Sequence, residues 1–310
     1  MVDDASTDDS LHIIERLAED NHIIRLERNE TNRGALYSFD RGLRLASGDY
    51  VYAAGADDRV LPGLFEKSLR LLSEFPNAGL CSALAWIEGD EGRDRGVSQV
   101  PLIARKPDYH SPGAVESLLR RGGSWFAGNT VIYRRLAAVE AGGYLPELKS
   151  YTDHFLSLVV ALRYGACFIP EPLGVYRSSE SGYNAAIMGD LRATSEIIDT
   201  IQRLMRSTYA DTFSPACTAH LISDFRYFAA KAVIESRLRE EEQLLETIDA
   251  WLGRGHWMGH RLVIAGLSQT AHMRGLIERL YLYVRLRRPT WRSVGSRIAQ
   301  QIIGPRDSES

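Results

Sequence analysis

The sequence predicts an α/β fold with a mixed, mainly parallel sheet, followed by a helical C-terminal region. Up to about residue 181, short β-type runs alternate with amphipathic helical stretches. Turns rich in Gly, Pro and Asp separate these runs. From residue 182 onward, nearly all apolar residues recur at helical spacing. We therefore expect two domains, 1–181 and 182–310.

The first elements follow from caps and periodicity. Ser10 can cap a helix, Gly48 can end the second helix, and Pro62 suits the first turn of the third. The elements expected up to residue 87 are, in order, a helix from Ser10, a strand over 22–26, a helix over 34–46, a strand over 50–54, a helix after Pro62 and a strand over 79–87.

The middle of the chain is less regular. Residues 88–112 are polar and indicate a long loop of the kind that closes over a substrate. The elements expected after this loop are strands over 130–133, 166–169 and 173–176, and helices over 136–140 and 153–164.

Composition restricts the functional class. The chain has 310 residues, is 45% hydrophobic, and carries 37 basic and 40 acidic side chains, which gives a net charge of −3. Nucleic-acid binders usually carry a basic excess, so we expect no nucleic-acid partner. Three separated cysteines fit a reducing compartment and exclude a disulfide framework. With no signal peptide and no apolar run of about 18 residues, we expect a cytoplasmic protein.

Asp57-Asp58 is the sharpest chemical feature. The pair directly follows a strand, at the carboxyl end where open α/β sheets bind ligands. Carboxylates bind Mg²⁺ or Mn²⁺ together with substrate phosphates. A helix-capping turn is the alternative interpretation, and taken alone the pair favours it.

Three further features have two interpretations each. Asp4 can accept a hydrogen bond from a nucleobase or belong to a capping cluster. Arg33, with free N–H groups of the helix that follows, can bind a diphosphate or lie in a surface turn. Asp153 can act as a general base toward a hydroxyl or cap a helix. Dinucleotide-binding, P-loop, zincin and serine-hydrolase patterns do not occur in the sequence.

The order of the motifs is more specific than any one of them, and it resembles the family 2 glycosyltransferases of GT-A fold over about residues 1–180. The matching segments are Val2-Asp3-Asp4, Ser6-Thr7-Asp8, Asn32-Arg33-Gly34, Gly48-Asp49-Tyr50-Val51, Ala56-Asp57-Asp58 with Pro62, Gly128-Asn129-Thr130, Tyr133-Arg134-Arg135, Gly142-Gly143-Tyr144, Thr152-Asp153, 169–173 and Tyr176-Arg177.

The resemblance implies transfer of a sugar, with inversion, from a nucleotide-diphosphate donor to an acceptor hydroxyl. The donor is expected to be a UDP-sugar and the acceptor a saccharide or a lipid-linked molecule, in cell-envelope or polysaccharide assembly. By the same resemblance, Asp4 bonds the uracil, Asp57 lies near the ribose and donor sugar, and Asp58 holds Mn²⁺ or Mg²⁺. Asp153 deprotonates the acceptor, and Arg33 contacts phosphate or base.

Three departures from the family pattern stand out. Gly55 occupies a position that is usually acidic, and Thr152 replaces an acid before Asp153. The chain also begins where the family's second strand ends. Either the true start lies upstream, or this version lacks a central strand and part of the uridine pocket. A sheet without that strand would expose unpaired backbone groups and apolar surface, so we expect low stability or no activity.

The C-terminal region and the overall function leave alternatives open. Residues 274–297 hold seven arginines and one acid, which suits peripheral contact with an anionic membrane surface. Packing of this face on protein, with solvated arginines, is slightly favoured. For the whole chain, the alternatives to a transferase are a non-catalytic sugar-nucleotide or partner-binding protein and a metal-dependent phosphohydrolase.

Overall fold

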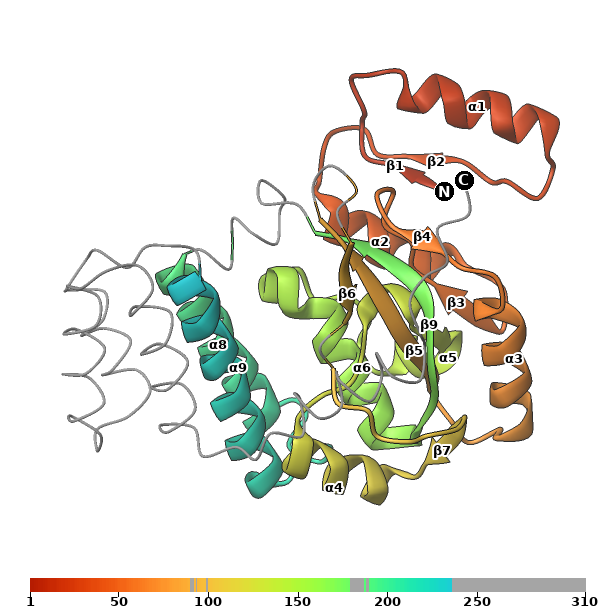
Figure 1. The fold of residues 1–310 in the computed structure, drawn as a ribbon. Helices are drawn as coiled ribbons and strands as arrows, with labels where there is room; N and C mark the ends of the chain where they lie inside the picture. The colour runs from red at the N-terminus through yellow and green to blue at the C-terminus, as the bar shows by residue number, and fades with distance from the viewer. Residues whose placement is uncertain (90–91, 93, 99, 179–186, 188–189, 236–310) are drawn as a thin grey trace.

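The computed structural model describes residues 1–310 except 90–91, 93, 99, 179–186, 188–189 and 236–310 (Figure 1). Its helices are α1 (Ser10–Asp20), α2 (Ala35–Leu45), α3 (Leu64–Glu74), α4 (Pro112–Gly122), α5 (Arg135–Glu140), α6 (Thr152–Tyr164), α8 (Leu191–Arg206) and α9 (Pro215–Glu235), with 3-10 turns η2 (Gly128–Thr130) and η3 (Pro146–Tyr151). Its strands are β1 (Val2–Asp3), β2 (Glu27–Arg28), β3 (Tyr50–Tyr52), β4 (Arg59–Val60), β5 (Leu80–Glu88), β6 (Asp94–Val97), β7 (Asp108–His110), β8 (Ile132–Arg134) and β9 (Ala166–Arg177).

A mixed sheet forms the centre of the molecule, with strand order β3-β8-β5-β9-β4. Strands β5 and β9 run parallel from the pair Leu80–Ala166 to the pair Glu88–Arg177. Strand β3 runs in the same direction, because the antiparallel β8 lies between it and β5. Strands β4, β6 and β7 pair antiparallel at the margins. The predicted α/β class with a mixed sheet is confirmed, with more antiparallel pairing than expected.

Helices cover both faces of this sheet (Figure 1). Successive side chains of a strand point to opposite faces, so one strand contributes to two cores. On β5, Leu80 and Leu84 belong to the core under α6, whereas Cys81 and Ala83 belong to the core under α3. The apolar run of β5 is therefore buried on both sides, as its composition predicts.

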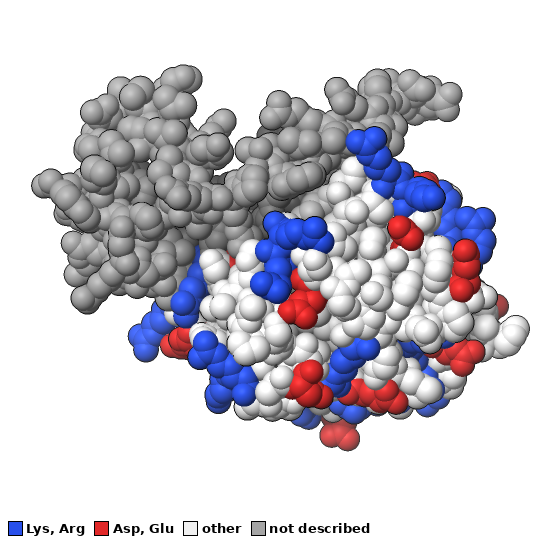
Figure 2. All heavy atoms as spheres, turned by 90° about the horizontal axis from the view of Figure 1, so that it is seen from below, with Lys and Arg blue, Asp and Glu red and all other residues white. Residues whose placement is uncertain are grey.

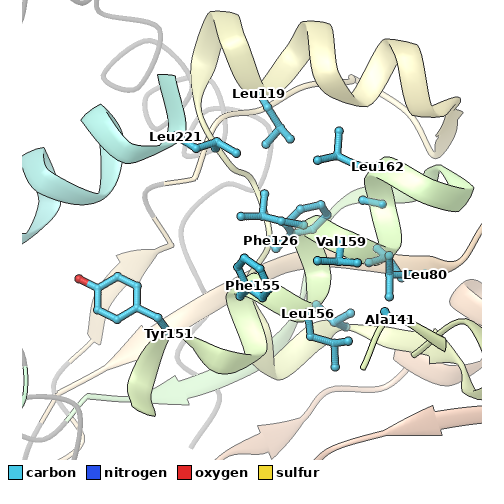
Figure 3. Close-up of a cluster of buried hydrophobic side chains, with 14 of the residues drawn as sticks. Leu80, Leu119, Phe126, Ala141, Tyr151, Phe155, Leu156, Val159, Leu162 and Leu221 are labelled. Carbon is cyan, nitrogen blue, oxygen red and sulfur yellow. The ribbon is translucent and has the colours of Figure 1, made fainter. Parts of the chain in front are cut away.

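Helices α8 and α9 extend the larger of these cores. Their buried side chains, which include Ile201, Leu221 and Phe225, join one cluster with Leu119 of α4 and Phe155 of α6. Figure 3 shows Leu221 and Leu119 projecting into the same apolar region. Helices α8 and α9 thus share a core with the preceding residues. The domain boundary near residue 182 stays a proposal that rests on the change in sequence pattern.

An outer layer formed by β1, β2 and α1 lies apart from the central sheet (Figure 1). Strands β1 and β2 pair only with each other within the described chain. No residue of α1 is buried, and Ile13 and Leu17 are exposed. The strand expected over 22–26 is wrong, because pairing with β1 selects Glu27–Arg28 instead and leaves Ile23 79% exposed.

The region expected to be one long loop contains two short strands. Residues 94–97 pair with β5 and residues 108–110 pair with β9. Prediction missed α4 and β4 as well. The two residues of β4 are exposed and owe their strand conformation to the neighbouring β9, which no local pattern of two residues can reveal.

The helical prediction for the C-terminal region is confirmed for α8 and α9. The expected turn near Ser214-Pro215 is found directly before α9. The basic segment 274–297 and the turns expected near Gly253–Gly255 and Pro289 lie outside the described residues. Among the described residues, no helix combines the length and apolarity that crossing a membrane requires.

Candidate active site

Asp58 lies where β3 and β9 end. The last residue of β9, Arg177, donates its backbone N–H to Asp58 Oδ1 at 3.1 Å. Burial, together with repulsion from Asp57 and Asp153, raises the pKa of the Asp58 carboxyl to about 6, against the opposing hydrogen bond from Arg177. Asp57 and Asp153 are thus both close enough to repel a charge on Asp58.

Gly55 gives the carboxylate pair its space. A Cβ at this position would lie 2.9 Å from Asp57 Oδ1 and 3.5 Å from Asp58 Oδ2. A longer acidic side chain would compete with Asp57 for the same volume. The absence of an acid at position 55 therefore suits the compact arrangement of this pair, in which Asp57 is exposed and Asp58 is partly buried.

Asp153 lies in the first turn of α6, and its carboxylate contacts the backbone of η2. A Cβ at Gly128 would lie 2.4 Å from Asp153 Oδ2, so only glycine permits this approach. Asp153 Oδ1 accepts the His154 N–H at 2.7 Å, although Asp153 is not the N-cap of the helix. Burial raises the pKa of the Asp153 carboxyl.

The turn η2 is fixed on two sides. Thr130 Oγ1 donates to the Ala83 carbonyl at 2.8 Å and accepts the Ala83 N–H at 3.1 Å. Tyr52 donates its hydroxyl to the Asn129 carbonyl at 2.9 Å. Burial and the nearby Asp58 raise the pKa of Tyr52, which keeps the phenol in its donating form. Strands β3 and β5 thereby hold Gly128 against Asp153.

Tyr52 and Gly128 are the site residues that sequence reasoning missed. Gly128 lies in the quoted motif Gly128-Asn129-Thr130, yet nothing local indicates that it contacts a carboxylate 25 residues away. Tyr52 ends the strand directly before the Asp pair. This position could have indicated a role in the site, because it places the Tyr52 hydroxyl near the end of the sheet where Asp57 and Asp58 lie.

Asp4 and Arg33 meet at the start of α2. Asp4 accepts the N–H groups of Arg33 and Gly34, each at 2.8 Å, and the side chain of Asn29 at 2.7 Å. Desolvation is the largest single effect and raises the pKa of Asp4, but the hydrogen bonds together outweigh it, so the pKa is lowered. The Asp4 carboxylate therefore already takes the N–H groups of Arg33 and Gly34. The Arg33 guanidinium lies 4.3 Å from the centre of the Tyr37 ring.

Electrostatic interactions thus connect Asp58 with Asp57 and Asp153, and a hydrogen bond connects Asp4 with Arg33. Within the described part of the chain, no hydrogen bond or ion pair joins the two groups. His154 is not aimed at a metal in this arrangement. Its ring packs against Phe126 and Phe225, and burial lowers its pKa to about 4.

The carboxylates fit a divalent cation that a ligand also coordinates. Among the described residues, no cluster of three or more His, Cys, Asp or Glu side chains could hold a metal alone. Mg²⁺ and similar ions are commonly held by one or two carboxylates plus substrate phosphates. Asp58, with Asp57 beside it, offers such oxygen ligands. A cation would offset the burial of the Asp58 charge and its repulsion by Asp57 and Asp153, which together raise the Asp58 pKa.

Comparison with known proteins finds a family match for the first part of the chain. Residues 1–135 match the family described as Glycosyl transferase family 2. An uncharacterized protein of Mycobacterium tuberculosis, MT1568, is 28% identical over 221 residues, which cover 69% of this chain and 67% of that protein. The uncharacterized glycosyltransferase YibD of Escherichia coli is 35% identical over 74 residues, or 24% of this chain and only 21% of that relative.

Two solved structures share the fold. TarS 1–349 from Staphylococcus aureus, in complex with UDP, has a TM-score of 0.54 at 16% identity, covering 97% of this chain and 81% of that one. The mannosyltransferase PcManGT from Pyrobaculum calidifontis, with GDP-Man and Mn²⁺, has a TM-score of 0.52 at 18% identity, covering 94% and 76%. The GT-A architecture expected from the motifs is confirmed.

Proposed function

We propose, on the premise that residues 1–135 belong to glycosyl transferase family 2, that this glycosyltransferase moves a sugar from a nucleotide-diphosphate donor to an acceptor hydroxyl with inversion. One observation carries the proposal. The charges of Asp153 and Asp58 are close enough to interact, which supports a general base beside a cation-binding carboxylate.

Asp153 is the proposed general base. Its carboxylate accepts the proton of the acceptor hydroxyl while that oxygen forms a bond to the anomeric carbon of the donor sugar. The bond from that carbon to the diphosphate oxygen breaks, and its electron pair leaves with the nucleotide. A raised pKa suits this role, because a base works best when its pKa approaches the working pH.

Asp57 and Asp58 form the donor side. Asp58 would hold Mn²⁺ or Mg²⁺ against the diphosphate, and the exposed Asp57 would bind the ribose or the donor sugar. Such an ion supplies Lewis-acid stabilisation of the charge that develops on the leaving diphosphate. The UDP and GDP-Man in the structures of TarS and PcManGT support a nucleotide-sugar donor.

Asp4 and Arg33 are proposed to contact the nucleotide. Hydrogen bonds from Arg33, Gly34 and Asn29 orient the Asp4 carboxylate, and a carboxylate is the group that accepts a hydrogen bond from a base N–H. Arg33 would act through its side chain alone, since Asp4 takes its backbone N–H. A role in cell-envelope or polysaccharide assembly, with a saccharide or lipid-linked acceptor, and a cytoplasmic location stay part of the proposal.

Titration calorimetry of UDP with Mn²⁺ tests the donor side directly. We expect binding that EDTA abolishes and that Asp58→Ala lowers by about tenfold or more, because one charged metal ligand is lost. Asp20→Ala, which removes an exposed carboxylate at the end of α1, is the matched control and should bind as the wild type does. Equal UDP affinity with EDTA and Mn²⁺ would contradict the proposed metal dependence.

The raised pKa of Asp58 predicts how this affinity changes with pH. Below about pH 6 the Asp58 carboxyl is mostly protonated, and this proton competes with the cation for the carboxylate oxygens. Mn²⁺-dependent UDP affinity should therefore rise up to about pH 6 and then level off. The same shift destabilises the free protein at neutral pH, because stability is lost as pH rises through the folded pKa. Asp58→Asn should therefore raise the free energy of unfolding at pH 7 by about 1–2 kcal/mol.

Urea denaturation at pH 4 and pH 7 measures this stability difference. The gain from Asp58→Asn should appear at pH 7 and shrink toward pH 4, where the wild-type carboxyl is already neutral in the folded state. Asp57→Asn, at an exposed neighbour, serves as the control and should change stability by no more than about 0.5 kcal/mol. A gain that does not depend on pH would rule out the raised pKa as its cause.

A further inference from the structure

The side chain of Asn29 lies between Asp4 and helix α2. Asn29 directly follows β2, is 3% exposed, and donates its backbone N–H to the Asp3 carbonyl at 2.8 Å. Its amide nitrogen donates to Asp4 Oδ1 at 2.7 Å and to Ser38 Oγ at 2.9 Å. Its amide oxygen accepts from Arg41 Nη1 at 2.6 Å. Both N–H groups and the oxygen of this buried amide are thus engaged.

The partners of the Asn29 amide allow one orientation. A guanidinium group carries donors and no acceptor, so the amide oxygen faces Arg41. An ionised carboxylate accepts hydrogen bonds and cannot donate them, so the amide nitrogen faces Asp4. Desolvation raises the pKa of Asp4, but its hydrogen bonds together have the larger effect, so the pKa is lowered and the carboxyl is ionised at neutral pH. The two charged neighbours therefore fix Asn29 as a donor to Asp4.

Arg41 is held in turn by the residues of β2. Besides the Asn29 amide, its guanidinium donates to the Arg28 carbonyl at 2.8 Å and to Glu27 Oε2 at 3.0 Å. These three acceptors belong to consecutive residues, and a planar guanidinium with several N–H groups can serve all of them at once. A continuous chain of hydrogen bonds thus connects β2, Arg41 of α2, Asn29 and Asp4.

The backbone beside Asp4 is strained. Ala5 has a φ of +57°, a left-handed conformation that is unfavourable for a residue with a Cβ. Such a conformation persists where surrounding contacts hold it. The hydrogen bonds to Asp4 from Arg33, Gly34 and Asn29 are contacts of this kind. Arg33 and Gly34 use backbone N–H groups, which most substitutions would keep, so Asn29 is the donor whose side chain the sequence selects.

We propose that Asn29 is a positioning residue for nucleotide binding, which holds the Asp4 carboxylate in the orientation that meets the nucleobase. This inference rests on the proposed contact between Asp4 and the base. Asn29 acts through Asp4, because its own side chain is buried and both of its N–H groups are already used. Arg41 has the supporting role of fixing the direction in which the amide donates.

Asn29→Asp tests this role, because it keeps the size of the side chain and replaces the donating nitrogen by an oxygen. Arg41 can still donate to the new carboxyl group. Two carboxylates at hydrogen-bond distance repel each other, so the new group and Asp4 should share a proton at low pH and lose it at high pH. A shared proton restores the hydrogen bond that the amide made. The other charged side chains of this network are those of Asp3, Arg25, Glu27 and Arg28.

Titration calorimetry of UDP with Mn²⁺ at pH 5.5 and pH 8 measures the effect. We expect the affinity of Asn29→Asp to be about tenfold or more below wild type at pH 8, and the difference to shrink at pH 5.5. The ratio of the two affinities at each pH removes the effect of Asp58, which both proteins share. Figure 2 shows the face seen from below Figure 1, away from the outer layer, where basic and acidic side chains are interspersed over the described surface. The described surface of that face offers no broad basic patch for unspecific binding of UDP.

Asn32→Asp is the matched control, since it makes the same chemical change in the loop before α2. Asn32 is exposed, and its side-chain oxygen accepts the Gly34 N–H at 3.2 Å, which a carboxylate can also do. Its UDP affinity should stay at the wild-type level at both pH values. Arg41→Lys is a second test that adds no charge beside Asp4. It keeps the positive charge but not the planar fork, and it should weaken UDP binding by about threefold or more.

The outcomes separate this inference from the proposed function. Wild-type affinity of Asn29→Asp at pH 8 overturns the positioning role, as does a loss of the same size at both pH values, which would indicate a purely structural effect. If urea denaturation shows that Asn29→Asp does not fold, wild-type affinity of Arg41→Lys overturns the role instead. Full UDP affinity of Asp4→Ala, or no UDP binding by the wild type, overturns the proposed nucleotide contact on which the inference rests.

Discussion

Replacing Asp153 by Asn is expected to lower the rate of sugar transfer by about 10²–10⁴-fold, the contribution typical of a positioned general base. The amide has the shape of the carboxyl group and can still accept the His154 N–H, but it cannot take a proton from the acceptor. Binding of UDP with Mn²⁺ should be unchanged, since Asp153 is proposed to act on the acceptor side. Nucleotide release in the presence of an acceptor panel measures the rate, and calorimetry measures the binding.

The same substitution separates catalysis from folding. Burial raises the pKa of Asp153, so the neutral amide should not lower the free energy of unfolding at pH 7. Asp20→Asn is the control for a lost carboxylate far from the site. Retained transfer in Asp153→Asn would show that another group accepts the proton. Nucleotide release that needs no acceptor would support the phosphohydrolase alternative.

Replacing Gly128 by Ala is expected to lower transfer by about 10²-fold, through displacement of the Asp153 carboxylate. The added Cβ would lie 2.4 Å from Asp153 Oδ2, well inside contact distance, so one of the two must move. Thr130 and Tyr52 fix η2 from both sides, so the carboxylate is the part that yields. A shift of about 1 Å in a reacting group is enough for a loss of this size.

Gly42→Ala provides the matched control for Gly128→Ala. Gly42 lies inside α2, and a Cβ there would make an ordinary contact with Val2 at 3.7 Å. This variant should gain about 0.5–1 kcal/mol of stability and keep full activity. Initial rates and urea denaturation of both variants complete the test. Wild-type turnover in Gly128→Ala would mean that the precise position of Asp153 is not required.

Several features of the site could be predicted from sequence because they follow from local patterns. The Asp57-Asp58 pair comes directly after a strand, so its place at the end of the sheet was predictable. The proximity of Asp153 to this pair depended on the family resemblance. Contacts across the chain escaped prediction, because neither the role of Gly128 nor that of Tyr52 leaves a local signal.

Errors in the fold have a related cause. The apolar run over 22–26 looks like a strand, yet the pairing partner β1 selects the two residues after it. A helix start has unsatisfied N–H donors, and one interpretation of Arg33 and Gly34 assigns such donors to an anion. Asp4, nearly 30 residues earlier, satisfies two of them. Local sequence preference allows several conformations, and tertiary contacts determine which of them forms.

The outer layer of α1, β1 and β2 has a consequence for ligand affinity. It contributes Asp4, whereas Asp58 and Asp153 belong to the deeply packed central body. A layer whose helix buries no side chain should open at a low free energy, and its amide protons should exchange long before those of β5 and β9. Only molecules in which this layer is closed can offer the Asp4 contact. The apparent nucleotide affinity is therefore the affinity of the closed form multiplied by the fraction of molecules that are closed. Mutations that tighten this layer would strengthen nucleotide binding without touching the nucleotide.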